Sequence, residues 1–205
     1  GLYALFLTIY LISADFLTFN LPNTFTKFLS ERKSESDKAK LIETFYGLSI
    51  GISFLSVAIF QVIVYLSLKI YPDISNSQSF FNILSLSLFF LTFTGMLSGI
   101  HNGLRSYDVV ANLEFVRRIS FGFFCIYSIV KLSSLEHIFF SILISNVIGF
   151  FYISYKSLTF LPLLPKFSME LWPLFTFAIK LSFVNWTASI ANYMDVFFIA
   201  YYIDL

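Results

Sequence analysis

Long hydrophobic runs separated by short polar segments are the dominant pattern of the chain. A helix needs about 20 mostly apolar residues to cross the hydrocarbon core of a bilayer. A transmembrane barrel would show alternating segments of about 10 residues, a pattern that this sequence lacks. Six runs have the length of a membrane helix, at residues 1–21, 45–68, 80–100, 115–132, 135–155 and 172–202. The pattern therefore predicts an all-α fold, a single transmembrane helix bundle with six spans over residues 1–205.

Two of these runs carry interruptions. The first contains Asp15 and is followed at once by Pro22, which we expect to end the helix because proline removes a backbone donor. The fourth run is the weakest, because Arg117 and Arg118 lie near its start.

The composition places the chain in a membrane. Hydrophobic residues make up 58% of the sequence, charged residues only 12%, and the mean hydropathy is +0.81. Soluble proteins average about 25% charged residues. A net charge of +1 without a basic tract excludes nucleic acid as a partner. The single cysteine, Cys125, excludes an intrachain disulfide and a thiolate metal cluster.

Basic residues are distributed very unevenly among the connections. Of the 13 Lys and Arg, ten fall in the first, third and fifth connections, while only Lys69 and Lys131 fall on the opposite side. Basic connections face the cytoplasm by the positive-inside rule. The first span then enters from the outside. Together with Gly1 in place of a starting Met, this leads us to expect a preceding span, so that the domain is partial.

Two further segments have structural interpretations. Residues 31–40 mix both charges with serine and are expected to form a solvated cytoplasmic loop. Gly95, Gly99 and Gly103 share one helix face, and small residues at this spacing let another backbone approach closely. We expect packing within the chain at this stripe, with a dimer interface as the alternative.

Ionisable residues inside the runs are candidates for function, because a charge that faces lipid costs about 2.5–3.5 kcal/mol or more. Asp15 lies in the first run, and Lys180 and Asp195 lie in the last. Three polar residues accompany them in the last run, namely Asn185, Trp186 and Asn192. These side chains suit either a cavity wall that accepts a sugar or hydrogen bonds between helices.

Three arginines, Arg105, Arg117 and Arg118, cluster near the expected cytoplasmic face. They are interpreted as anchors of the topology, and the alternative is a contact to anionic lipid headgroups.

Enzyme motifs are absent. The sequence holds no glycine-rich phosphate loop, no H-E-x-x-H, no G-x-S-x-G and no D-x-D pair. We therefore predict a transporter rather than an enzyme, with no cofactor and no metal site.

Three segments, taken in order, resemble the polysaccharide-biosynthesis (O-antigen) flippases of the multidrug/oligosaccharidyl-lipid/polysaccharide exporter superfamily. GLYALFLTIYLISADF with the exit TKFLSER looks like that family's second span, which has a late Asp and a basic-aromatic exit. GMLSGIHNGLRSYD is similar to the fourth span, and FAIKLSFVNWTASIANYMDVFFIAYYIDL resembles the seventh. The chain departs from the family just after Asp15, where relatives usually carry glycine and this chain has Phe16-Leu17, followed by an Asn-Leu-Pro insertion at residues 20–22.

The resemblance implies a two-lobed exporter fold, of which this chain would form the second to seventh helices. The implied function is movement of an undecaprenyl-diphosphate-linked oligosaccharide from the inner to the outer leaflet of the bacterial plasma membrane by alternating access, for surface polysaccharide such as lipopolysaccharide. The partners would be the bilayer, the lipid-linked substrate and other polysaccharide-assembly membrane proteins. Lys180 would hold the diphosphate, and Asp15 and Asp195 would carry a coupling proton or sodium ion.

Three alternatives stay open. A cation-coupled multidrug exporter of the same superfold would favour acidic and aromatic cavity walls. The others are a membrane-embedded enzyme of glycan assembly and a purely structural subunit.

Overall fold

The computed structural model describes residues 2–70, 78–131, 135–161 and 171–202, and this part of the chain contains seven helices and no strand. The helices are α1 (Leu2–Leu17), α2 (Leu21–Glu31), α3 (Glu35–Ile70), α4 (Gln78–Gly103), α5 (Tyr107–Lys131), α6 (Leu135–Ser157) and α7 (Trp172–Tyr202). The predicted all-α fold is confirmed.

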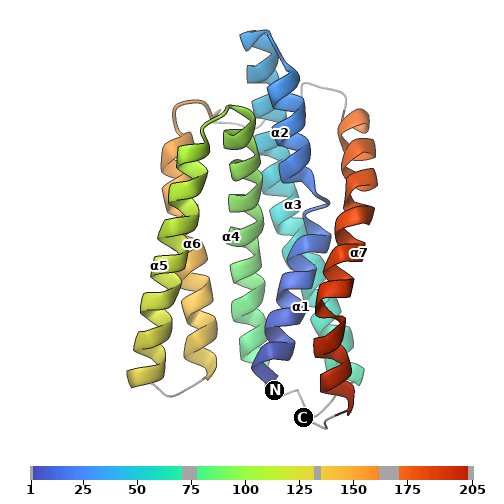
Figure 1. The fold of residues 1–205 in the computed structure, drawn as a ribbon, viewed down its shortest axis with the longest axis vertical. Helices are drawn as coiled ribbons and strands as arrows, with labels where there is room; N and C mark the ends of the chain where they lie inside the picture. Colours follow the sequence, from blue (N-terminus) through green and yellow to red (C-terminus); the bar gives the residue numbers. More distant parts are fainter. Residues whose placement is uncertain (1, 71–77, 132–134, 162–170, 203–205) are drawn as a thin grey trace.

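The helices form one elongated bundle whose members run along a common axis (Figure 1). Helix α4 lies at the centre and contacts α2, α3 and α6 most extensively. Helix α5 packs mainly on α6 at one edge, and α7 packs on α1 and α2 at the other. Helices α1 and α2 lie end to end, so that together they occupy the length of one pass.

Four helices among the described residues are long and apolar enough to cross a membrane: Glu35–Leu66, Gln78–Gly103, His137–Ser157 and Trp172–Ala191. They correspond to the expected second, third, fifth and sixth spans. Helix α1 is too short alone, with 16 residues. Helix α5 carries too much charge, from Asp108, Glu114, Arg117 and Arg118. Length and composition therefore support four spans, whereas the sequence pattern had predicted six.

The expected loop over residues 31–40 is largely helical instead. Helix α2 continues to Glu31, and α3 already begins at Glu35. Glu35 and Asp37 lie in the first turn of α3, where their charge complements the positive end of the helix dipole. Lys38 adds an ion pair to Glu35 at 2.7 Å. A charged, serine-containing sequence is therefore compatible with the start of a helix as well as with a loop.

The first predicted span is broken in its second half. Helix α1 ends at Leu17, and Phe19 and Asn20 take left-handed backbone conformations, with φ of 47° and 51°. Pro22 then lies in the first turn of α2, where a missing N–H costs nothing. The prediction that Pro22 ends the helix was wrong in its position: the chain leaves the helix before the proline and starts a new helix around it.

The glycine stripe of α4 receives α2. A Cβ atom built on Gly99 would lie 2.7 Å from the Cα of Pro22, and one on Gly103 would lie 2.8 Å from the Cβ of Leu29. The Thr26 hydroxyl also donates to the Gly99 carbonyl at 3.0 Å. The expectation that these glycines pack within the chain is confirmed.

Two apolar clusters fill the bundle, one on each side of the break. The first joins α2, α3 and α4 and contains Phe25 stacked on Phe45, with ring centroids 3.8 Å apart. The second joins α1, α4 and α6 around Leu84 and Phe139. The last buried residue of α1, Leu17, belongs to the second cluster, and Leu21 belongs to the first. The break therefore separates two regions of tight packing.

We expect Gly99→Ala to lower the unfolding temperature in detergent, because its methyl group would collide with the Pro22 backbone, and overpacking costs about 1–3 kcal/mol. Gly51→Ala is the matched control, since nothing lies within 4 Å of a Cβ at that position. It should leave the unfolding temperature unchanged or raise it, because alanine favours helix. Equal unfolding temperatures for the two variants would contradict the close contact of α2 with α4.

Candidate functional site

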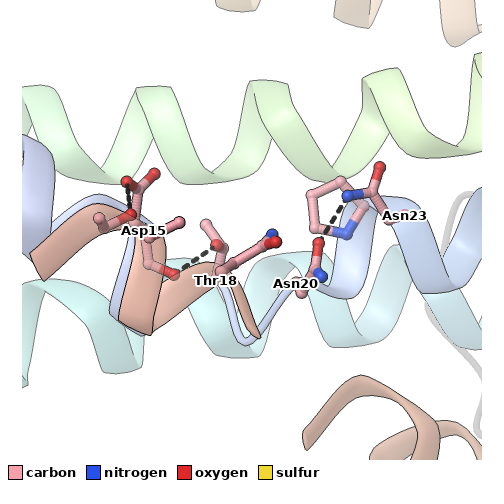
Figure 2. Close-up of a pocket in the computed structure, with 8 residues that line it drawn as sticks. Asp15, Thr18, Asn20 and Asn23 are labelled. Carbon is pink, nitrogen blue, oxygen red and sulfur yellow. Dashed lines mark hydrogen bonds between the residues drawn. The ribbon is translucent and has the colours of Figure 1, made fainter. Parts of the chain in front are cut away.

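A polar pocket of about 310 Å³ lies at the break between α1 and α2 and is closed on one side by α7 (Figure 2). Its lining residues are Asp15, Thr18, Asn20, Pro22, Asn23, Asn185, Ala188 and Ser189. The interrupted helix supplies five of them and α7 supplies three. The pocket exists because the chain abandons helical geometry at residues 18–20, which turns polar side chains towards α7.

Asp15 is the one charged residue among the described residues that line the pocket. Its carboxylate accepts a hydrogen bond of 2.7 Å from the Ser189 hydroxyl, and its backbone carbonyl accepts one of 3.2 Å from Thr18. The side chain is exposed rather than buried. No Lys, Arg or His lines this pocket among the described residues. Among the described residues that line the pocket, the Asp15 carboxylate therefore has only neutral hydrogen-bonding neighbours.

Asn20 lies in the turn of the break and lines the pocket. Its side-chain oxygen accepts a hydrogen bond of 2.6 Å from the Asn23 amide, as Figure 2 shows. Asn20 is only 7% exposed, and its Nδ2 atom has no hydrogen-bond partner. A buried polar atom without a partner costs about 1–3 kcal/mol. The residue lines the pocket, but its Nδ2 atom is buried and is not open to the pocket in this conformation.

Aromatic rings fasten α7 to the interrupted helix beside the pocket. Trp186 stacks on Phe16 with centroids 4.9 Å apart and planes within 2° of each other, and it meets Phe19 edge-on at 5.8 Å. The indole Nε1 is buried and has no hydrogen-bond partner. Trp186 does not line the pocket, although its neighbour Asn185 does. Its position is that of an anchor for α7.

The predicted site residues are brought together only in part. Asp15, expected to couple an ion, and Asn185, expected to bind substrate, share the pocket. Lys180 lies exposed on α7 and is not part of the lining. The side chains of Asn192 and Asp195 lie outside the residues whose side chains the structure describes. Their assignments stay predictions, as does that of Lys180.

The three arginines have different surroundings. Arg105 lies in the turn between α4 and α5 with φ of 62°, and Arg118 is exposed. Arg117 points inward instead: its guanidinium donates to Glu114 at 2.8 Å and to the Asn146 oxygen at 2.8 and 3.2 Å. A contact with lipid headgroups stays a prediction for all three.

Arg117 ends a buried network that the sequence did not indicate. The Asn146 amide donates to the Tyr10 hydroxyl at 3.0 Å and to Ser87 at 2.7 Å, and Tyr10 and Ser87 lie 3.1 Å apart. The network joins α1, α4, α5 and α6. Asn20 and Ser189 were also missed, because single polar residues recur throughout the apolar runs and only folding shows which of them meet. The Asn-Leu-Pro sequence at residues 20–22 was the one available signal.

The chemistry available in the pocket is hydrogen bonding and cation binding. One carboxylate, three carboxamides and two hydroxyls line it, and no group of three or more His, Cys, Asp or Glu in the described part of the chain could hold a metal ion. The chain matches no protein-family model, no curated protein and no solved structure.

We expect the pocket to admit water. In a Cys125→Ser background, Asn185→Cys should react with a charged methanethiosulfonate reagent at least about tenfold faster than Val184→Cys, because only a hydrated thiol ionises readily. Val184 is the neighbouring residue, is 67% exposed and does not line the pocket. The rates are measured in lipid nanodiscs. Equal reaction rates at positions 185 and 184 would show that Asn185 is no more hydrated than Val184, and would contradict a water-filled pocket.

Proposed function

We propose that the chain is part of a membrane transporter that moves an undecaprenyl-diphosphate-linked oligosaccharide from the inner to the outer leaflet by alternating access. The observation that carries this proposal is the Asp15 pocket at the interrupted helix. The resemblance to polysaccharide-biosynthesis flippases supplies the substrate class.

The interrupted helix supports a transport role. Transporters commonly build their binding sites from discontinuous helices, because unwound backbone is tolerated within a membrane only where it lines a cavity or is buried in protein. Residues 18–20 meet this condition, since Thr18 and Asn20 line the pocket. Asp15 likewise avoids the cost of a charge that faces lipid by facing the pocket.

The arrangement of the passes supports a six-span topology. With α1 and α2 counted as one pass, the seven helices of the described residues make six passes, and consecutive passes run in opposite directions (Figure 1). The α2–α3 and α4–α5 connections, the end of α6 and the start of α7 all lie at the same end. Those are the basic connections, so this end would face the cytoplasm. The outer face of α5 suits lipid, since Phe115, Phe123 and Val130 are 64–69% exposed.

In this proposal the diphosphate lies outside the Asp15 pocket. A carboxylate repels phosphate, and no basic side chain among the described residues lines the pocket. Lys180 is exposed on α7 and remains available to a phosphate group. It would act as a point charge with three donors, which is how lysine binds phosphates.

A cation-coupled multidrug exporter is the second candidate. The observation that favours it is the acidic and aromatic character of this region, where Asp15 stands without a basic neighbour in the pocket wall and Trp186 stacks on Phe16. Cationic drugs are recognised by carboxylates and aromatic faces.

Deletion of the gene should abolish surface polysaccharide. Complementation with the Lys180→Ala variant should restore at least about tenfold less surface polysaccharide than complementation with the unmodified gene, because a charge-assisted hydrogen bond contributes about 1.5–3 kcal/mol. Lys131→Ala, an exposed lysine at the end of α5, is the matched control and should restore it fully. The measurement is the surface glycan of complemented cells. Unchanged glycan in the deletion strain together with lost drug resistance would favour the multidrug exporter.

A further inference from the structure

We propose that Arg117 is a positioning residue for the Asp15 pocket, although it lies on α5 and does not line that pocket. It acts through Asn146 of α6 and Tyr10 of α1, which hold the first half of the interrupted helix against α4. The inference rests on the proposed function only in treating this pocket as the working site. The contacts that lead from Arg117 to α1 do not depend on what is transported.

Helix α4 holds both halves of the interrupted helix in one register. Before the break, the Tyr10 hydroxyl of α1 lies 3.1 Å from the Ser87 hydroxyl of α4. After the break, the Pro22 backbone of α2 lies against Gly99 of α4. Both pairs are 77 positions apart in the sequence, so the interrupted pass and α4 advance together across the break. The geometry of the pocket at the break therefore depends on both contacts.

The contact before the break is a hydrogen-bonded one, and α6 completes it. The Asn146 amide donates to the Tyr10 hydroxyl at 3.0 Å and to the Ser87 hydroxyl at 2.7 Å. All three side chains are buried. Water cannot replace a partner that is lost in such a place, so each member of the network depends on the others.

Arg117 determines which way the Asn146 carboxamide points. Its Nε and one terminal nitrogen both donate to the Asn146 oxygen, at 3.2 and 2.8 Å. A guanidinium has donors only, so it selects the orientation in which the carboxamide oxygen faces α5 and the NH₂ group faces α1 and α4. Without Arg117, the reversed orientation would no longer be excluded. In that orientation Asn146 could not donate to Tyr10.

Gly149 makes room for the Arg117 side chain to reach Asn146. A Cβ atom at position 149 would lie 2.6 Å from the Cγ and 2.7 Å from the Cδ of Arg117. Gly149 and Asn146 are three positions apart on α6 and so share one face of that helix. Glu114 balances the charge of the guanidinium at 2.8 Å. Arg117 is thus held in place from two helices, with its donors directed into the bundle.

The pocket side of α1 reports whether this support is intact. Helix α7 contacts α1 through the Ser189–Asp15 hydrogen bond and through the stack of Trp186 on Phe16. Helix α2 keeps its own contact with α4 when the network is lost. Release of Tyr10 therefore lets α1 shift relative to α2. The shift changes the surroundings of Trp186.

The test is acrylamide quenching of Trp186 fluorescence in lipid nanodiscs, at a temperature at which every variant is folded. A Trp172→Phe background leaves Trp186 as the reporter, because the chain has two tryptophans. We expect Arg117→Ala to raise the quenching constant at least about twofold, because release of α1 opens the packing around the indole. Gly149→Ala should do the same, because it keeps Arg117 but displaces its side chain from Asn146.

Two control variants separate this effect from general disturbance. Gly122→Ala matches Gly149→Ala, since nothing lies within 4 Å of a Cβ at position 122. It should leave the quenching constant unchanged, as should Lys156→Ala, which removes an exposed basic side chain of α6. In an Arg117→Ala background, Gly149→Ala should have no further effect, because the added methyl group then displaces no arginine.

An unchanged quenching constant in either Arg117→Ala or Gly149→Ala would overturn the proposal, even if the unfolding temperature fell, because the network would then only stabilise the fold. Additive effects of the two substitutions would also overturn it. The measurement contains no lipid-linked substrate. A protein whose Trp186 responds to Arg117→Ala but which exports no glycan would therefore overturn the proposed function and not this inference.

Discussion

The contact between the Pro22 backbone and Gly99 is the constraint on which the rest of the structure depends. A continuous helix through residues 15–25 would require the proline ring to occupy the space of the carbonyl four residues earlier. The chain avoids this by leaving the helix at Thr18 and restarting at Leu21. The restarted helix can lie close to α4 only because Gly99 and Gly103 have no side chains to exclude it.

The break determines where polar chemistry is found in a mostly apolar bundle. On either side of it, buried aromatic and aliphatic side chains pack tightly. At the break itself, Thr18, Asn20 and Asn23 are turned towards α7, which contributes Asn185 and Ser189. A carboxylate one turn before the break then faces a pocket instead of lipid. The fold thus places the Asp15 carboxylate beside α7, where it accepts a hydrogen bond from Ser189.

Much of the fold could be predicted from the sequence, because helix length and hydrophobicity are properties of short segments. Asp15 was found because a charge in an apolar run is conspicuous. The sequence did not predict the position of the break. Pro22 by itself indicates only that a helix ends, and the close packing of α2 on α4 shows that a second helix begins at once. Arg117 was interpreted as an anchor of the topology near the cytoplasmic face, and the alternative, a headgroup contact, is untested. Its partner Asn146 is 29 residues away, so no local pattern could show that its side chain bonds inward.

The central claim is that one pass of the bundle is interrupted at residues 18–20. Hydrogen–deuterium exchange of the chain in lipid nanodiscs tests it most directly, because the first amides of a restarted helix have no partner four residues earlier. We expect fast exchange at Asn20 and Asn23, whose amides donate no backbone hydrogen bond, whereas those of Phe19 and Leu21 do. These two positions should lie between protected segments in α1 and α2, and exchange should be slow through the middle of α4. Uniform protection from Leu7 to Leu29 would show a continuous helix and would contradict the account.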